Sequence, residues 1–213
     1  MGGSTLKVLF CTPVYAPFIG GASTSLQVMG NSLVAAGHPV TVLTTTALRA
    51  SDFWQPAAPR DPPAQVLDGV TVERLPLFYP WPAPYTFGLL RRLGLWLHRS
   101  GMPQGLARPV QSALARWMPP LRGLPEALER WAPQVDLIHS DDSSWDGLLV
   151  AAARAARLYR KPLVIRPLMH LGSAWVRAHY QMAHQVSLYR EAGAILALSA
   201  LEAEAYAQLG VAP

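Results

Sequence analysis

The stretch LKVLFCTPVYAPFIGGASTSLQVMGNSLVAAGHPVTVLT, residues 6–44, decides the fold of this chain. Its apolar run at 6–11 is typical of a parallel strand that is buried on both faces. Apolar side chains recur at helical spacing over 22–36, and a hydroxyl side chain at 23–25 is expected to cap this helix. The run at 40–44 forms a second strand. The stretch therefore predicts a strand–helix–strand unit with a parallel sheet.

A glycine pair lies between the first strand and the helix. Unpaired backbone N–H groups at a helix N-terminus, with the helix dipole behind them, favour an anion. We therefore expect a phosphate to bind at Gly20, Gly21, Ala22 and Ser23. The alternative is that the glycine pair only turns a tight corner.

Three common site motifs are absent from the sequence. The dinucleotide fingerprint needs G-x-G-x-x-G and an acidic residue after the second strand, whereas this chain has FIGGAS at 18–23 and TTT at 44–46. No Walker motif occurs, which argues against P-loop chemistry. No G-x-S-x-G elbow occurs either, which disfavours an α/β-hydrolase.

Four segments, in the same order along the chain, resemble family 4 retaining glycosyltransferases of GT-B architecture. They are the opening at 7–42, VDLIHS at 135–140, KPLVI at 161–165 followed by His170, and AGAILALS at 192–199 with Glu202 and LGV at 209–211. The similarity is weakest between residues 50 and 132. The resemblance implies an α/β fold with a Rossmann-like parallel sheet and helices on both faces, forming one half of a GT-B enzyme.

The resemblance also implies a domain organisation. Residues 1–213 are expected to form a single N-terminal, acceptor-side Rossmann-like domain, with the C-terminal donor-binding domain absent from this chain. A length of 213 residues suits one large α/β domain. The chain alone is therefore expected to be inactive.

The implied activity of the full enzyme is transfer of a sugar from a nucleotide-sugar donor to an acceptor hydroxyl, with retention and without a metal. A hexosyltransferase type is expected. No cofactor is expected, because the nucleotide sugar is a co-substrate bound mainly by the absent domain. The acceptor is expected to be a glycan, a lipid-linked molecule or a small molecule. The alternative function is a non-catalytic phosphosugar- or nucleotide-binding module.

His170 is the expected catalytic residue. It follows the strand expected at 163–167, and open α/β sheets bind ligands at the carboxyl ends of their strands. The resembled family has a histidine beside the donor sugar at this point. In that family a short Thr-x-His segment usually follows the strand, whereas this chain has RPLM at 166–169 before His170. The alternative is a loop histidine bonded to backbone. Three further residues are expected in the same donor-phosphate or acceptor site: His139 at the end of the fourth strand, Asp141 and Arg166.

The run SDDS at 140–143 places two carboxylates near a strand end, where Mg²⁺ can bind. Its adjacent pair does not have the Asp-x-Asp spacing of metal-dependent sugar transferases, so no metal site is expected. Asp142 or Ser143 is expected instead to cap a helix that begins at Trp145.

The segment 89–130 is rich in arginine and poor in carboxylates. In the helix expected at 85–98, one face carries Leu89, Leu93, Trp96 and Leu97. We expect contact with an anionic membrane surface or an anionic acceptor through Arg91, Arg92, Trp96 and Arg99, beside the aromatic residues Phe78, Tyr79 and Trp81. The alternative is an ordinary helix that packs its apolar face on the domain and exposes its basic face to solvent.

Composition and charge limit the function classes. Hydrophobic residues make up 51% of the chain, enough for a full core. No apolar run approaches the ~20 residues of a membrane-spanning helix, and residues 1–4 lack signal-peptide features. The single cysteine, Cys11, is expected to be a buried apolar residue. Nucleic acid is not an expected partner, because no binding motif accompanies the net charge of +5. The expected location is the cytoplasm, with peripheral contact to the inner face of the membrane as a further expectation.

The remaining elements follow from periodicity and capping. A helix is expected to start at Ser199, where Ser199 and Glu202 have capping-box spacing. Other expected elements are a strand at 69–75, a helix at 106–118, a short helix ending near 131, and helices at 145–159 and 175–190.

Overall fold

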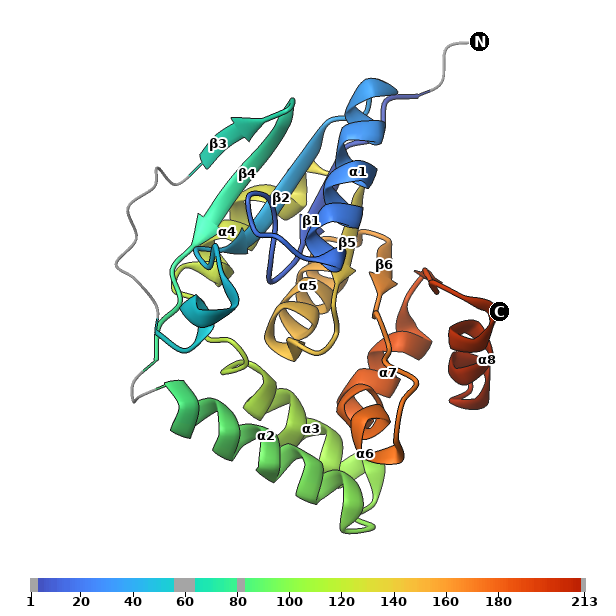
Figure 1. Ribbon diagram of the computed structural model, residues 1–213. Helices are drawn as coiled ribbons and strands as arrows, with labels where there is room; N and C mark the ends of the chain where they lie inside the picture. Colours follow the sequence, from blue (N-terminus) through green and yellow to red (C-terminus); the bar gives the residue numbers. More distant parts are fainter. Residues whose placement is uncertain (1–3, 56–63, 80–82, 212–213) are drawn as a thin grey trace.

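The computed structural model describes residues 4–55, 64–79 and 83–211. Its centre is a seven-stranded sheet in the order β3-β4-β2-β1-β5-β6-β7, in which only the β3–β4 pair is antiparallel (Figure 1). The expected Rossmann-like fold class is thereby confirmed. The strands are β1 Val8–Cys11, β2 Val40–Thr45, β3 Ala64–Leu67, β4 Val70–Leu75, β5 Leu137–Asp141, β6 Leu163–Arg166 and β7 Ala194–Ile195.

Helices cover both faces of this sheet and continue beyond its carboxyl edge. Figure 1 shows α2 and α3 together below the carboxyl ends of the strands, away from the sheet. The helices are α1 Gly21–Ala35, α2 Ala83–Arg99, α3 Gln104–Ala115, α4 Leu124–Trp131, α5 Asp146–Leu158, α6 Ala174–Arg177, α7 Ala183–Glu191 and α8 Ala200–Gln208. Short 3-10 turns occupy Ala50–Phe53, Ala132–Gln134 and Ala178–Tyr180.

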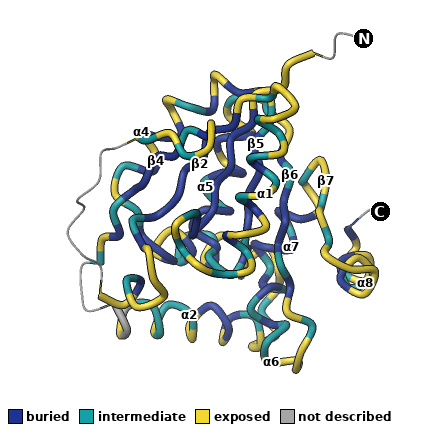
Figure 2. Tube along the Cα trace, turned by 45° about the horizontal axis from the view of Figure 1, so that its top comes forward, coloured by how far each residue is buried: buried dark blue, intermediate teal, exposed yellow. Residues whose placement is uncertain are grey.

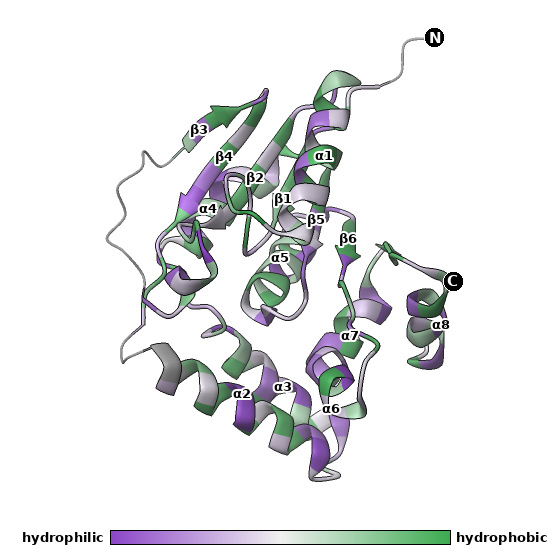
Figure 3. Ribbon diagram, in the orientation of Figure 1, coloured by the Kyte–Doolittle hydropathy of each residue, from purple (hydrophilic) through white to green (hydrophobic). Residues whose placement is uncertain are grey.

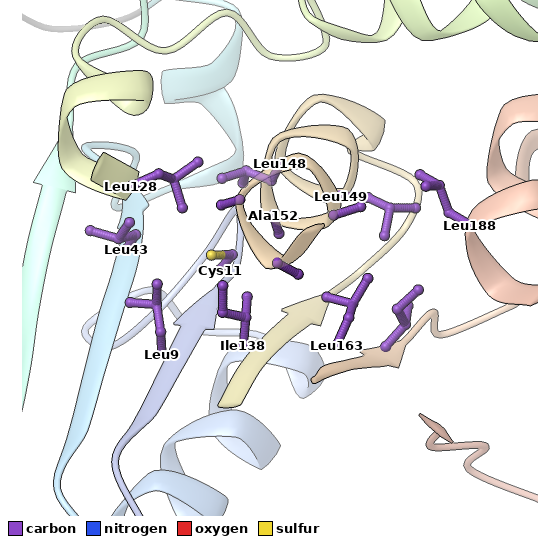
Figure 4. Close-up of a cluster of buried hydrophobic side chains, with 14 of the residues drawn as sticks. Leu9, Cys11, Leu43, Leu128, Ile138, Leu148, Leu149, Ala152, Leu163 and Leu188 are labelled. Carbon is purple, nitrogen blue, oxygen red and sulfur yellow. The ribbon is translucent and has the colours of Figure 1, made fainter. Parts of the chain in front are cut away.

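Alternation along the strands divides the core between the two faces. Val8 and Phe10 of β1 pack with Leu26 of α1 on one face, whereas Leu9 and Cys11 face α5 on the other. Figure 2 shows the central strands in dark blue, and β1 and β2 are buried along their whole length. Figure 4 shows the cluster between the sheet and α5. Cys11 is buried, as expected, and burial raises the pKa of its thiol to about 12.

Two capping predictions are wrong. The N-cap of α1 is Gly20, and no side chain caps the helix within the described residues. The helix begins one residue earlier than expected, so the hydroxyls at 23–25 lie inside its first turns. Neither Asp142 nor Ser143 caps α5, whose N-cap is Trp145. The Asp142 carboxylate bonds Ser144 instead, and Ser143 Oγ bonds Pro167 O and Tyr189 OH.

The helix expected at 175–190 is divided into α6, a 3-10 turn and α7. The side chain of Gln185 accepts a bond from Met182 N and donates to His179 O and to Ser143 O in the β5–α5 loop. A tertiary anchor thus replaces the continuous helix that local periodicity predicts.

The expected cap of α8 is confirmed in part. Ser199 Oγ accepts a bond from Glu202 N over 3.2 Å. The carboxylate of Glu202 does not return to the N-cap but accepts bonds from Leu198 N at 2.6 Å and Met169 N at 2.8 Å. It therefore ties α8 to the loop after β6, in which His170 lies.

Candidate functional site

The amino end of α1 is open to solvent at the carboxyl edge of the sheet. Gly21 is exposed, and a Cβ placed on it would meet no atom within 4 Å. No side chain in the described part of the chain bonds the first N–H groups of the helix. The N-terminus thus presents free donors with the positive end of the helix dipole, which is the arrangement that binds anions elsewhere. Phosphate binding at Gly20, Gly21, Ala22 and Ser23 stays a prediction.

A buried ion pair lies beneath this N-terminus. Arg166 at the end of β6 donates through Nε to Asp141 Oδ1 at the end of β5, and their side chains are 4% and 0% exposed. Arg166 Nη2 also donates to Ala22 O in the first turn of α1 over 3.3 Å. The structure therefore brings Asp141 and Arg166 together with the glycine pair. They hold the first turn of the helix and do not face solvent.

His139 lies in this buried layer too, and its expected position at a strand end is wrong. It sits in the middle of β5, is 2% exposed and packs on Phe10 with ring centroids 4.9 Å apart. Its Nε2 lies 3.8 Å from Asp141 Oδ1. Within the described residues, three buried atoms here have no hydrogen-bond partner: His139 Nε2, Asp141 Oδ2 and Ser23 Oγ.

The loop after β5 has a fixed and unusual backbone. Asp142 has φ 56°, a left-handed conformation that Asp adopts more readily than most residues but still at a cost. Asp142 N donates to Arg166 O at 3.0 Å, and Ser143 N to Pro167 O at 3.1 Å. Ser143 Oγ donates to Pro167 O and accepts from Tyr189 OH at 2.8 Å. Neighbouring elements therefore hold Asp142 at the edge of the sheet.

Asp142 and His170 form the polar part of the site. Asp142 Oδ1 accepts from Ser144 N and Ser144 Oγ. Burial raises the pKa of the Asp142 carboxyl, and the charge of Asp141 adds to this, while the bonds from Ser144 and the charge of His170 oppose it. His170 is exposed, with its ring 5.8 Å from that of Tyr180. A carboxylate, an imidazole and a phenol thus gather at the same edge as the α1 N-terminus.

A second buried ion pair connects α2 to this site. Arg91 Nη1 lies 3.2 Å from Asp146 Oδ1, with side-chain exposures of 11% and 0%. His184 Nε2 lies 3.0 Å from Asp146 Oδ2, and Arg91 Nη2 donates to Ser144 O. Arg91 is therefore held by the first turn of α5 and turns inward, and its expected contact with a membrane or an anionic acceptor stays a prediction.

The other residues expected at an anionic surface do lie on the outside. Arg92 and Arg99 are exposed, and Trp96 is 61% exposed. They do not join the site of Asp142 and His170. Phe78 is 46% exposed, and the guanidinium carbon of Arg122 lies over its ring, 4.8 Å from the centroid. Trp81 lies outside the described residues.

Sequence reasoning missed Asp142, Ser144 and Tyr180 as site residues. The sequence offers one usable signal, a carboxylate directly after a buried strand, but the same pattern is also typical of a helix cap. The left-handed backbone of Asp142 and its proximity to His170 depend on β6 and are not visible in local sequence.

Three general features complete the description of the chain. Across residues 4–55, 64–79 and 83–211, no three His, Cys, Asp or Glu side chains group to hold a metal ion. None of the helices in that part of the chain is long and apolar enough to span a bilayer. A cavity of about 460 Å³ lies between α3, α4 and α5, and no residue of the candidate site lines it.

Comparison with known proteins identifies the family. A family model described as glycosyl transferase 4-like domain matches residues 20–213, and the chain belongs to this family. The chain is similar to two solved structures of SsfS6, a glycosyltransferase of Streptomyces sp. SF2575. The first of these structures has 16% sequence identity to this chain and a TM-score of 0.33. The second, which is complexed with thymidine diphosphate, has 14% sequence identity and a TM-score of 0.35. In both, the match covers 87% of this chain and 44% of the other, so this chain spans less than half of their length. The curated proteins gave no match.

Proposed function

We propose that this chain is the N-terminal, acceptor-side domain of a glycosyltransferase. The enzyme takes a nucleotide sugar, held mainly by a second domain, and transfers a hexosyl group to an acceptor hydroxyl with retention and without a metal. The acceptor is a glycan, a lipid-linked molecule or a small molecule. Membership of the glycosyl transferase 4-like family supports the reaction class.

The observation that carries the proposal is the open N-terminus of α1 beside Asp142 and His170. When the bond between the anomeric carbon and the phosphate breaks, negative charge develops on the departing phosphate. Fixed N–H donors and a helix dipole stabilise that charge without reorganising, and in many enzymes such preorganised dipoles supply most of the rate enhancement. The Arg166–Asp141 pair orients these donors by binding Ala22 O.

The bonds and protons of the reaction balance without a further reactant. The acceptor oxygen forms a bond to the anomeric carbon, the bond to the phosphate oxygen breaks, and the acceptor proton passes to the released phosphate. In this proposal His170 positions the transferred sugar. Asp142 accepts a hydrogen bond from an acceptor hydroxyl, since Ser144 occupies only its Oδ1.

A replacement of Gly21 tests the proposal. Because a Cβ at Gly21 points into open space, Gly21→Val leaves the fold intact but fills the position of the phosphate. We expect transfer by the complete protein to fall on the order of 100-fold, the scale seen when one such donor is lost. The measurement is product formation with a panel of nucleotide sugars and acceptors. The anomeric configuration is read by NMR, and the assay is repeated in EDTA.

Gly105→Val is the matched control. Gly105 also lies in the first turn of a helix with nothing within 4 Å of its Cβ position. The two variants should melt at similar temperatures, and only Gly21→Val should lose activity. Equal loss of stability and activity in Gly21→Val would show that the glycine pair only turns a corner. Nucleotide binding without any transfer would favour the non-catalytic binding module instead.

A further inference from the structure

The outer face of α2 carries an exposed apolar stripe. Tyr85, Leu89, Leu93 and Trp96 are 77%, 68%, 39% and 61% exposed. Their spacing of four, four and three residues places them on one side of the helix. Arg92 and Arg99 lie on the same side and are exposed. We call these six residues the α2 stripe.

The opposite face of α2 is the one that packs on the domain. Leu95 and Leu97 are buried, Arg91 pairs with Asp146, and Gln111 of α3 donates to Gly94 O over 3.1 Å. The stripe therefore turns away from the sheet and from the candidate site. Figure 2 shows α2 along the outer edge of the molecule with exposed turns, and Figure 3 shows apolar and hydrophilic residues mixed along it.

The sequence segment that contains the α2 stripe carries positively charged side chains and no carboxylates. The sequence has no Asp or Glu between Glu73 and Glu126, whereas this segment contains seven arginines: Arg74, Arg91, Arg92, Arg99, Arg108, Arg116 and Arg122. Within the ranges that the structure describes, neither Arg92 nor Arg99 forms an ion pair. Two unpaired cations thus sit among exposed aromatic and aliphatic side chains, with no carboxylate on the same helix.

We propose that the α2 stripe docks the domain onto an anionic lipid bilayer. A single convex helix suits a bilayer surface, into which its leucines enter at the boundary of headgroups and acyl chains. Tyr85 and Trp96 have the amphipathic rings that favour this interface. Arg92 and Arg99 bind the phosphates of anionic headgroups. The occupant is therefore a membrane surface and not a protein groove, and the docking requires neither a donor nor an acceptor.

Vesicle binding of the 213-residue chain tests this inference. The probes are vesicles of phosphatidylcholine with phosphatidylglycerol, and vesicles of phosphatidylcholine alone. We expect co-sedimentation with the anionic vesicles only, weakening as salt shortens the Debye length from about 10 Å at 0.1 M to about 3 Å at 1 M. Each arginine near such a surface contributes about fivefold to partitioning, so Arg92→Gln with Arg99→Gln should weaken binding about 30-fold.

A control variant with two other arginines replaced separates the effect of the α2 stripe from the effect of the net charge of the chain. Arg154→Gln with Arg160→Gln removes the same charge from exposed positions on and after α5 and should leave binding nearly unchanged. Brominated lipids should quench the tryptophan fluorescence of the wild-type chain, and Trp96→Phe should lose most of this quenching. All variants should melt like the wild type, because the replaced side chains are exposed.

The proposal is overturned if the wild-type chain ignores anionic vesicles, or if both arginine pairs weaken binding equally. It is also overturned if brominated lipids quench Trp96→Phe as strongly as the wild type. Each of these results leaves the glycosyl-transfer proposal untouched, because that proposal is tested by product formation.

Discussion

Replacing Arg91 by Met tests the packing of α2 most directly. The substitution keeps the aliphatic stem of Arg91 but removes its guanidinium, which lies 3.2 Å from the fully buried carboxylate of Asp146. It also removes the donor to Ser144 O, which precedes α5. Among the described residues, the buried carboxylate then keeps only the ring of His184, with Nε2 at 3.0 Å, as a side-chain partner.

The expected loss of stability follows from this geometry. Removing one partner of a buried ion pair costs about 3–5 kcal/mol, because the other charge stays buried without compensation. His184 still partners Asp146, which places Arg91→Met near the lower end, about 3 kcal/mol. For a domain of this size each kcal/mol lowers Tm by roughly 2–4 °C, so we expect a decrease of about 6–12 °C.

The neighbouring residue provides the control. Arg92→Met removes the same group one position along α2, where the side chain is exposed, and should change the free energy of unfolding by less than about 0.5 kcal/mol. Urea denaturation of both variants, of Asp146→Asn and of the double variant Arg91→Met/Asp146→Asn completes a double-mutant cycle. Equal stabilities for Arg91→Met and Arg92→Met, or a coupling energy near zero, would refute the inward orientation of Arg91.

Two further outcomes are expected. Burial raises the pKa of Asp142 above its ordinary value of 3.8. The folded state therefore favours the protonated carboxyl. As the pH rises above 3.8 the carboxyl ionises more readily in the unfolded chain, so the free energy of unfolding decreases. Asp142→Asn should therefore be more stable than the wild type at pH 7, with the difference vanishing at acid pH in denaturant titrations. A destabilised Asn variant at pH 7 would contradict this. Glu202→Ala should lower the free energy of unfolding by about 2–4 kcal/mol, since two N–H groups lose their buried acceptor. The control Glu204→Ala, at an exposed position of α8, should be nearly neutral, and equal losses would disprove the anchoring role of Glu202.

Local pattern predicted the central elements well. The apolar runs at β1 and β2 and the periodic segment between them indicated the correct strand–helix–strand unit, because a buried parallel strand and an amphipathic helix have distinct periods. The edge strand β3 was missed. Its signal was present in Asp68-Gly69, with φ of 48° and 83°, a dipeptide typical of a two-residue hairpin turn between β3 and β4.

The candidate site was predictable only as a location. Parallel strands end at one edge, so Asp141 and Arg166 had to lie near the glycine pair once the strands were identified. That Arg166 pairs with Asp141 and also binds Ala22 depends on the register in which β5 and β6 align. Local sequence does not contain this register, since the two strands are joined by α5.

The sequence by itself determined the strand and helix periods, the glycine pair at the start of α1 and the absence of carboxylates between Glu73 and Glu126. Tertiary structure alone decided which side of α2 is buried. Helical spacing grouped Leu89, Leu93, Trp96 and Leu97 as one face. The first three are exposed and Leu97 is buried, whereas Arg91 turns inward with only 11% of its side chain exposed. The physical reason is that spacing records only which side chains share a face. The free energy of burying that face depends on its partners, and those of Arg91 are Asp146 and Ser144, more than fifty residues away along the chain.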